Sequence, residues 1–237
     1  MKREKLGPPS PFRQLRAADE VTGTTSKRTG LRGPPEFSMA YEQFMPGATA
    51  VGIAYKDGVV LGAERRITLG NFVRSKSGKK VFRVTDSVGA VCAGMVADMQ
   101  NLVKEVAVYS KLKELETRKT LKPNSVAKLM STLMFQNRYA PLLTQVILGG
   151  MGAKPVVYVL DPLGSVISDQ YATVGTGEET AIGVVEAGYS PTMSQKEARD
   201  LAISAIKAAI ARDAMSGNGI DILTIDDSGI KEEGIDL

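Results

Sequence analysis

The stretch that decides the fold runs from Gly47 to Thr68 and reads Gly47-Ala48-Thr49-Ala50-Val51-Gly52-Ile53-Ala54-Tyr55-Lys56-Asp57-Gly58-Val59-Val60-Leu61-Gly62-Ala63-Glu64-Arg65-Arg66-Ile67-Thr68. Two short apolar segments flank a Lys-Asp-Gly turn, and their β-branched residues favour extended strands. An Asp-Gly pair is typical of tight hairpins, which need a positive φ. We therefore predict a β-hairpin here, and we expect any chemistry at its first residues.

The length and composition of the chain indicate one folded domain with extensions. It has 237 residues, of which 43% are hydrophobic and 24% are charged, which is enough to bury a full core. The sequence holds no apolar run of about eighteen residues, and its N-terminus lacks the apolar core of a signal peptide. We therefore expect a cytoplasmic protein without contact to a membrane.

The first forty residues differ from the rest. They contain five prolines, and eight Lys or Arg against four Asp or Glu, an excess of four that equals the net charge of +4 for the whole chain. The remaining residues are therefore balanced, which argues against a nucleic-acid-binding surface. We predict that residues 1–46 form a disordered or removable leader, and Met39 is an alternative start. A basic arm that grips a partner is the open alternative.

The residues that are missing exclude several mechanisms. The chain contains no histidine, which removes Ser-His-Asp and Cys-His catalysis and most zinc sites. Its one cysteine, Cys92, lies in an apolar run, where a thiol is usually a small buried hydrophobe, and it allows no intrachain disulfide. Any catalysis must therefore use carboxylates, lysine, a hydroxyl or an amino terminus.

The order of the predicted elements indicates an α+β fold. After the hairpin we expect a turn at Gly70-Asn71, strands at 79–84 and 88–94, helices at 97–118 and after Pro123, strands at 142–150, 156–160 and 165–168, helices at 178–187 and after Ser194, and a strand at 220–225. Asn124 is the expected N-cap of the second helix. Ser194 and Glu197 form a capping box for the fourth, which we expect Gly217 and Gly219 to end. Strands and helix pairs in this order predict helices that cover packed sheets.

Seven short motifs make the prediction more specific. They are the hairpin, Gly70-Asn71-Phe72-Val73, Ser75-Lys76 with Lys79-Lys80, Ala93-Gly94 followed by Asp98, Gln145-Val146-Ile147-Leu148-Gly149-Gly150, Gly175-Thr176-Gly177, and Arg212-Asp213-Ala214-Met215-Ser216-Gly217. Together the chain resembles a proteasome β-type subunit of the archaeal kind from about Gly47 to Thr224. The resemblance implies the four-layer αββα sandwich of N-terminal-nucleophile hydrolases. We expect this domain at 47–228, followed by a C-terminal tail at 229–237.

The chemistry that the resemblance implies needs no histidine. In the family an autoprocessed threonine becomes the mature N-terminus, its hydroxyl attacks a peptide carbonyl, and its own α-amine accepts the proton. An α-amine has an ordinary pKa of about 7.7–8.0, so much of it is neutral near physiological pH. A lysine oriented by a carboxylate favours the alkoxide, and a backbone N–H stabilises the oxyanion. The resemblance thus implies a threonine-type endopeptidase of broad specificity.

Carried over residue by residue, the resemblance assigns roles to six positions. Lys80 is the lysine, Glu64 its carboxylate partner and Gly94 the oxyanion donor; the outer supports are Thr176, Asp213 and Ser216. Taken singly, the charged residues among them are better explained as solvated surface groups or ion pairs. Their joint match to one pattern is what assigns Lys80, Asp213 and Ser216 to a site.

The start of the hairpin departs from the family. Aligned without gaps, the nucleophilic threonine falls on Ala48, so release at Gly47–Ala48 is chemically excluded and Ala48–Thr49 is the nearest bond that precedes a hydroxyl. Successive strand residues point to opposite faces, so Thr49 should point away from Lys80 unless a bulge redirects it. Where active members have aspartate, this chain has Glu64, whose extra bond of about 1.5 Å exceeds the tolerance of catalytic geometry.

Three interpretations remain open. The first is a threonine-type peptidase subunit that uses Thr49. The second, which we favour, is a non-catalytic β-type subunit that fills ring positions beside an active paralogue. The third is a binding protein outside this family, with a basic arm and no α-type partner.

The resemblance also implies partners and a substrate pocket. The expected partners are α-type subunits and other β-type subunits in stacked seven-membered rings, an ATP-driven unfoldase and unfolded polypeptides. No nucleic acid is expected, and the resemblance implies no metal and no organic cofactor. The pocket for the substrate side chain would be mostly apolar and would consist of Ile67, Gly78, Cys92, Val96 and Gln100.

Overall fold

The fold is described from a computed structural model, which describes residues 47–237. The predictions for the leader at 1–46 lie outside these residues. The strands are β1 (Thr49–Tyr55), β2 (Gly58–Glu64), β3 (Ile67–Leu69), β4 (Phe72–Ser75), β5 (Val81–Arg83), β6 (Val88–Gly94), β7 (Thr144–Met151), β8 (Pro155–Leu160), β9 (Val166–Asp169), β10 (Tyr171–Gly175), β11 (Ile220–Asp226) and β12 (Gly229–Ile235). The helices are α3 (Val96–Thr117), α4 (Pro123–Gln136), α5 (Glu178–Gly188) and α6 (Gln195–Ile210).

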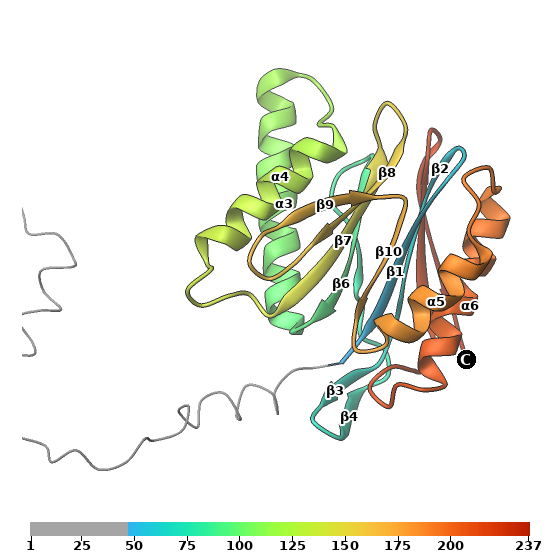
Figure 1. The fold of residues 1–237 in the computed structure, drawn as a ribbon. Helices are drawn as coiled ribbons and strands as arrows, with labels where there is room; N and C mark the ends of the chain where they lie inside the picture. The colour runs from blue at the N-terminus through green and yellow to red at the C-terminus, as the bar shows by residue number, and fades with distance from the viewer. Residues whose placement is uncertain (1–46) are drawn as a thin grey trace, which may run out of the picture. The chain divides into compact units, whose positions relative to one another are not determined.

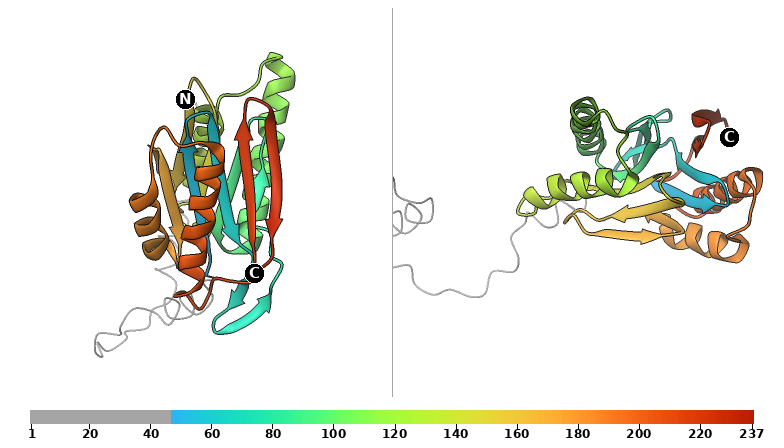
Figure 2. Two further views of the ribbon diagram at one scale, coloured as in Figure 1. Left: turned by 90° about the vertical axis from the view of Figure 1, so that its right-hand side faces the viewer. Right: turned by 90° about the horizontal axis from the view of Figure 1, so that it is seen from above.

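The strands form two packed sheets between two helix layers. One sheet has the order β10-β1-β2-β11-β12 and the other the order β5-β6-β7-β8-β9, while β3 and β4 form a separate hairpin. Helices α5 and α6 cover the outer face of the first sheet, and α3 and α4 cover the second, as Figures 1 and 2 show. This is the α+β arrangement of helices over packed sheets that the element order predicts, with the four αββα layers.

Three apolar clusters hold these layers together. The cluster between the sheets includes Ala50, Leu61 and Ile147, all fully buried. The cluster beneath α3 and α4 contains Cys92, and the cluster beneath α5 and α6 contains Val51. Because Ala50 and Val51 are neighbours in β1, the two faces of this strand belong to different cores. The alternation of side chains along β1 therefore decides which layer each of its residues meets.

The first hairpin forms as predicted, but its turn differs. Strands β1 and β2 pair antiparallel from Ala50 with Ala63 to Tyr55 with Gly58, as expected. Among the described residues, however, the positive-φ positions include no member of this turn, so the expected positive φ at Asp-Gly is wrong. Gly58 is instead required by packing, because a Cβ there would lie 2.3 Å from the Ile225 carbonyl oxygen in β11.

The ends of three elements also correct the sequence predictions. Helix α4 begins at Pro123 with Lys122 as its N-cap, so Asn124 is not the cap; proline suits the first helical position because its missing N–H has no partner there. Helix α6 has the predicted capping box but ends at Ile210, well before Gly217. The residues of the predicted C-terminal tail form β12, which pairs with β11 along its whole length.

No helix in residues 47–237 is both long enough and apolar enough to span a membrane.

Candidate active site

The main chain of Ala48 lies in a network of hydroxyls and one carboxylate. Its N–H donates to Thr176 Oγ1 at 3.2 Å, and the Thr176 hydroxyl donates to Asp213 Oδ2 at 2.6 Å. Thr176 lies between β10 and α5, and Asp213 lies in the loop after α6, so the first residues of the hairpin meet segments more than 120 positions away. The side chain of Ala48 packs in the core between the sheets.

Thr49 points in the opposite direction, as the strand alternation predicts. Its hydroxyl makes a 2.7 Å hydrogen bond with Ser216 Oγ, and its side chain is fully buried. A Cβ on Gly177 would lie 2.1 Å from Thr49 Oγ1 and 2.9 Å from Ala209 Cβ of α6, so the hydroxyl is on the side of the α5–α6 layer. Glycine at position 177 is what leaves room for it.

The Glu64 carboxylate is the acceptor at the centre of the site. Its Oε1 accepts from the Thr49 N–H at 3.3 Å and from Lys80 Nζ, and its Oε2 accepts from the N–H groups of Arg66 at 2.6 Å and Gly217 at 3.0 Å. Burial raises the pKa of Glu64, while the charge of Lys80 and these N–H donors oppose that change. Four donors around one carboxylate fix its position and favour its charged form.

Lys80 is buried directly before β5, and two oxygen atoms accept hydrogen bonds from its amine. Besides Glu64, its amine donates to the Arg66 carbonyl oxygen at 2.5 Å. Burial lowers the pKa of Lys80, and the charges of Glu64 and then Asp213 oppose this. The two predicted residues Lys80 and Glu64 thus form one buried ion pair. A buried amine of lowered pKa beside a carboxylate is suited to receiving or releasing a proton.

Asp213 joins the two hydroxyl branches of the network. Its Oδ2 accepts from Ser216 Oγ at 2.7 Å as well as from Thr176, and its Oδ1 accepts from the Met215 N–H at 2.9 Å. The chain of bonds from Thr49 through Ser216 to Asp213 is therefore continuous with the chain from Ala48 through Thr176. The structure brings together Thr49, Glu64, Lys80, Thr176, Asp213 and Ser216, six of the seven predicted catalytic residues, by direct bonds or shared partners.

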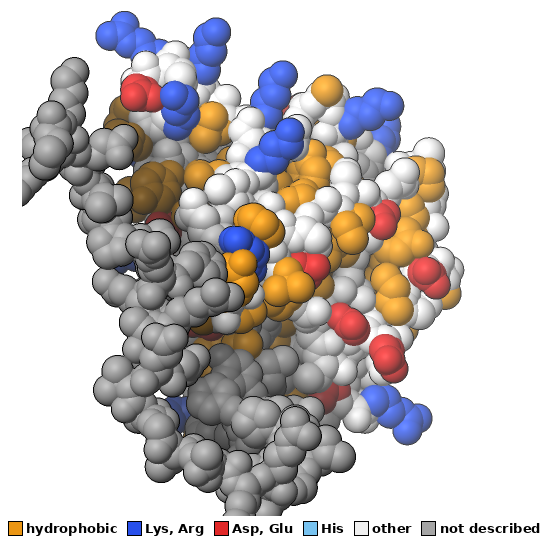
Figure 3. Space-filling view, turned by 60° about the vertical axis from the view of Figure 1, so that its left-hand side comes forward, with side chains coloured by type: hydrophobic (Ala, Val, Ile, Leu, Met, Phe, Trp, Pro, Cys, Tyr) orange, Lys and Arg blue, Asp and Glu red, His pale blue; other side chains and the backbone are white. Residues whose placement is uncertain are grey.

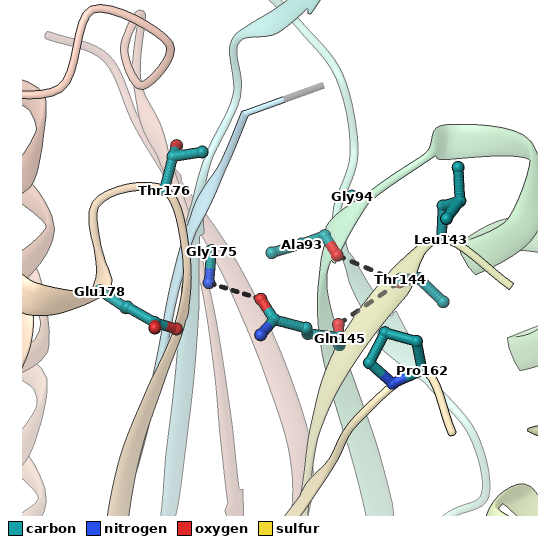
Figure 4. Close-up of a pocket in the computed structure, with 9 residues that line it drawn as sticks. All are labelled: Ala93, Gly94, Leu143, Thr144, Gln145, Pro162, Gly175, Thr176 and Glu178. Carbon is teal, nitrogen blue, oxygen red and sulfur yellow. Dashed lines mark hydrogen bonds between the residues drawn. The ribbon is translucent and has the colours of Figure 1, made fainter. Parts of the chain in front are cut away.

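Gly94, the seventh, lies at the end of β6 beside a cavity. Its φ is +126°, and a Cβ there would lie 2.2 Å from the Leu143 carbonyl oxygen, so only glycine fits. The cavity holds about 320 Å³ and opens between the ends of β6, β7 and β10 (Figure 4). Thr176 borders the same cavity, which links Gly94 to the network at Ala48.

The predicted substrate-pocket residues lie elsewhere around the site. Ile67 and Gly78 pack together, since a Cβ on Gly78 would lie 2.2 Å from Ile67 Cδ1. Cys92 belongs to the core under α3 and α4, where burial raises the pKa of its thiol. Val96 and Gln100 are in the first turns of α3, half-buried and exposed respectively. None of the five borders the cavity beside Gly94.

Sequence reasoning missed two polar residues of this cavity. Gln145, on β7, accepts from the Gly175 N–H at 3.0 Å through its side-chain oxygen and so connects the two sheets. Glu178 is the first residue of α5 and its carboxylate borders the cavity. A single polar side chain in the otherwise apolar run after Thr144 was the available signal for Gln145.

Comparison with known proteins shows the family of the chain. A model of the proteasome subunit family matches residues 45–225. The chain therefore belongs to the proteasome subunit family.

Similar relatives are archaeal proteasome beta subunits. The chain is 52% identical over 189 residues to proteasome subunit beta 1 of Nitrosopumilus maritimus, which covers 80% of this chain and 96% of the relative. It is 50% identical to proteasome subunit beta 1 of Cenarchaeum symbiosum, over 79% of this chain and 97% of the relative. Proteasome subunit beta 2 of Pyrobaculum arsenaticum is 47% identical, over 82% of this chain and 96% of the relative.

Proposed function

We propose that this chain is a β-type subunit of a proteasome core particle that helps to enclose the degradation chamber and supplies no nucleophile of its own. One observation carries the proposal. The main chain of Ala48 is bonded to Thr176, and through it to Asp213, where the resemblance places a nucleophilic threonine, but the side chain there is a methyl group. A methyl group has no lone pair with which to attack a carbonyl.

The orientation of Thr49 supports the same proposal. Its hydroxyl is bonded to Ser216 on the side of the α5–α6 layer, and Thr49 does not border the cavity beside Gly94. A nucleophile must lie within hydrogen-bonding reach of its base and about 3 Å from the place where the oxyanion donor holds the carbonyl. Thr49 would have to rotate out of a buried bond to meet that requirement.

The partners proposed for the chain follow from its family. They are α-type subunits and other β-type subunits in stacked seven-membered rings, and an ATP-driven unfoldase that delivers unfolded polypeptides in the cytoplasm. In this arrangement an active paralogue cleaves the polypeptide, and the present chain contributes wall and binding surface to intracellular protein degradation.

A second candidate function has one observation in its favour. The amide of Thr49 already contacts Glu64, and its hydroxyl contacts Ser216, so two predicted catalytic residues touch it. If the bond between Ala48 and Thr49 were cleaved, that amide nitrogen would become an α-amine close to Lys80. The chain would then be a threonine-type peptidase with a slipped start.

The two functions are distinguished by measuring peptide hydrolysis in particles where this chain is the only subunit that could supply a nucleophile. The particles contain α-type subunits, this chain, and a β-type partner whose N-terminal threonine is replaced by alanine. We expect no peptide hydrolysis above background, either with the wild-type chain or with T49A. Matched particles with the active partner establish that assembly is competent. Hydrolysis by particles with the inactive partner that disappears with T49A would establish the second function instead.

A further inference from the structure

The cavity beside Gly94 is lined by apolar, polar and charged residues, and the proposed function assigns no role to it. Its residues come from the ends of three strands and the start of α5, and they are Ala93, Gly94, Leu143, Thr144, Gln145, Pro162, Gly175, Thr176 and Glu178. Its volume of about 320 Å³ lies at the lower end of the range of pockets that hold small ligands or single side chains.

One side chain gives the cavity its charge. Among the described residues, Glu178 is the only charged member of the lining. Burial raises the pKa of Glu178, and the neighbouring Glu179 adds to this, while the backbone at Gly175 opposes it. Figure 4 shows the carboxylate on one side of the gap and the Gln145 amide on the other. A half-buried carboxylate of this kind favours a positively charged ligand.

The remaining walls suit an alkyl chain. Leu143, Pro162 and Ala93 contribute apolar groups to the lining of the cavity. Long cationic side chains place their methylene stems along apolar surfaces while their charged ends reach a polar partner. The cavity thus combines apolar groups with a carboxylate, which matches the apolar stem and charged end of lysine or arginine.

Two glycines allow the strands around the cavity to pack closely against their neighbours. Gly175 has a φ of +101°, and a Cβ there would lie 2.1 Å from the Ala48 carbonyl oxygen and 3.0 Å from Ala93 Cβ. Gly94 is equally restricted. Glycine at both positions therefore fixes the positions of the surrounding lining residues, and it places the cavity beside the main chain of Ala48.

We propose that this cavity binds a lysine or arginine side chain of an unfolded polypeptide, with Glu178 as its counter-ion. The inference rests on the proposed function in one respect, because it assumes that polypeptides reach this face of the subunit. The chain would then have a binding role, in which a subunit without a nucleophile retains basic segments of the polypeptide while a neighbouring subunit cleaves it.

Peptide binding to the full chain tests this proposal without any turnover. The probe is a capped peptide of alanine and glycine with one central lysine, and its match has norleucine in place of lysine. Calorimetry gives both dissociation constants, and the mass of the peptide after each titration shows that it is intact. We expect the lysine peptide to bind at least tenfold more tightly than the norleucine peptide.

Two matched variants test whether the lysine side chain binds at Glu178. Glu178 and Glu179 are adjacent in the first turn of α5, where both interact favourably with the helix dipole, so E179Q is the matched control for the charge that E178Q removes. We expect E178Q to weaken binding of the lysine peptide at least tenfold and E179Q to change it less than twofold.

Equal binding of the two peptides, equal effects of the two variants, or no binding by the wild-type chain would each overturn the inference. Cleavage of the peptide during the titration would instead contradict the proposed function, in which this chain has no nucleophile. The affinity of the E178Q variant for the peptide would still test whether Glu178 binds the lysine side chain.

Discussion

Ala48 and Thr49 separate two properties that an N-terminal nucleophile normally combines in one residue. Ala48 has the backbone contacts, through Thr176 and Asp213, but no hydroxyl. Thr49 has a hydroxyl, but that hydroxyl is bonded to Ser216 on the side of the α5–α6 layer. The rest of the predicted set, including the Lys80–Glu64 ion pair, is assembled around them. The site therefore has no hydroxyl oxygen at the position where the resemblance places the nucleophile.

Restoring that atom should restore chemistry. We predict that A48T, in a chain released so that position 48 is its N-terminus, hydrolyses fluorogenic peptides once it is assembled with its partners. The α-amine would accept the proton, and Lys80 would favour the alkoxide. Mass spectrometry with an electrophile that traps N-terminal threonine measures occupancy of the site. The double variant A48T/K80A should fall by about 10²-fold or more. Inactivity of a folded, assembled A48T particle would show that more than one atom is missing.

Tyr55, at the far end of β1, makes the free energy of unfolding depend on pH in the alkaline range. Burial is the main cause that raises the pKa of Tyr55 from 10.0 to about 12, with smaller contributions from Asp226 and Asp57. The folded state thus holds the phenol proton to higher pH than the unfolded state, and this stabilisation is complete below pH 10 and is lost as the pH rises toward 12.

We predict that the free energy of unfolding falls more steeply across this window in the wild type than in Y55F. Urea denaturation at several pH values measures the free energy of unfolding of both proteins. The difference between the two profiles removes the contribution of the other titrating groups, which both proteins share. Parallel pH profiles for the two proteins would show that the folded and unfolded states bind this proton equally.

At the scale of elements, the fold requires glycine at a strand end near the site but not at a position within α5. Gly175 ends β10 at a φ of +101°, next to the Ala48 carbonyl oxygen. Gly183 lies within α5, and a Cβ there would have no neighbour within 4 Å. The same substitution should therefore have opposite effects at the two positions.

We predict that G175A destabilises the chain by about 1–3 kcal/mol, because it adds backbone strain and a steric clash. G183A should stabilise it by about 0.5–1 kcal/mol, because alanine is the better helix former. Chemical denaturation measures both, and G183A is the internal control for the added methyl group. If G175A matched the wild type, the position of β10 relative to Ala48 would be wrong.

Local patterns in the sequence predicted the helices and strands more accurately than they predicted the contacts between these elements. Alternation along β1 predicted opposite directions for the side chains of Ala48 and Thr49, and this is confirmed, because the side-chain period of a strand is a local property. The capping box at Ser194 was equally local and was confirmed. Gly58, in contrast, was assigned to a turn, since nothing near it in sequence shows the close approach of Ile225 in β11.

Long-range partners explain what the sequence did not predict about the site. Glu64 was matched to Lys80, but its bond to the Gly217 N–H joins residues 153 positions apart and follows only from the fold. The segment 229–237 was expected to be a tail, yet its charged residues Lys231, Glu232 and Glu233 lie in an edge strand, where Lys79 pairs with Glu232 at 2.5 Å. Exposed charges are common on edge strands because they oppose pairing with other chains.

At the scale of the whole molecule, one helix leaves an apolar stripe uncovered. Val108, Leu112 and Leu115 are spaced by four and three residues on α3 and are 59%, 59% and 67% exposed. Figure 3 shows hydrophobic side chains among Lys and Arg on the side of the molecule that carries α3 and α4. Members of the proteasome subunit family assemble with other subunits, and such a stripe is suited to burial in an assembly.

We predict that L112E weakens assembly with other subunits tenfold or more, since burying a leucine side chain contributes about 1.5–3 kcal/mol. Native mass spectrometry of mixtures at several concentrations measures the effect, and the thermal stability of the isolated chain should be unchanged. N101E, at an exposed polar position of the same helix, adds the same charge as a control. Assembly of L112E at wild-type concentrations would exclude this stripe as an interface.

The most direct test of the central claim is the intact mass and N-terminal residue of this chain after co-assembly with α-type and other β-type subunits. We predict that the assembled chain retains Ala48, because no hydroxyl follows the Gly47–Ala48 bond and Thr49 is held by Ser216. A chain that retains Ala48 cannot use Thr49 as an N-terminal nucleophile. A mature chain that begins at Thr49 would contradict the account and identify the subunit as a working threonine peptidase.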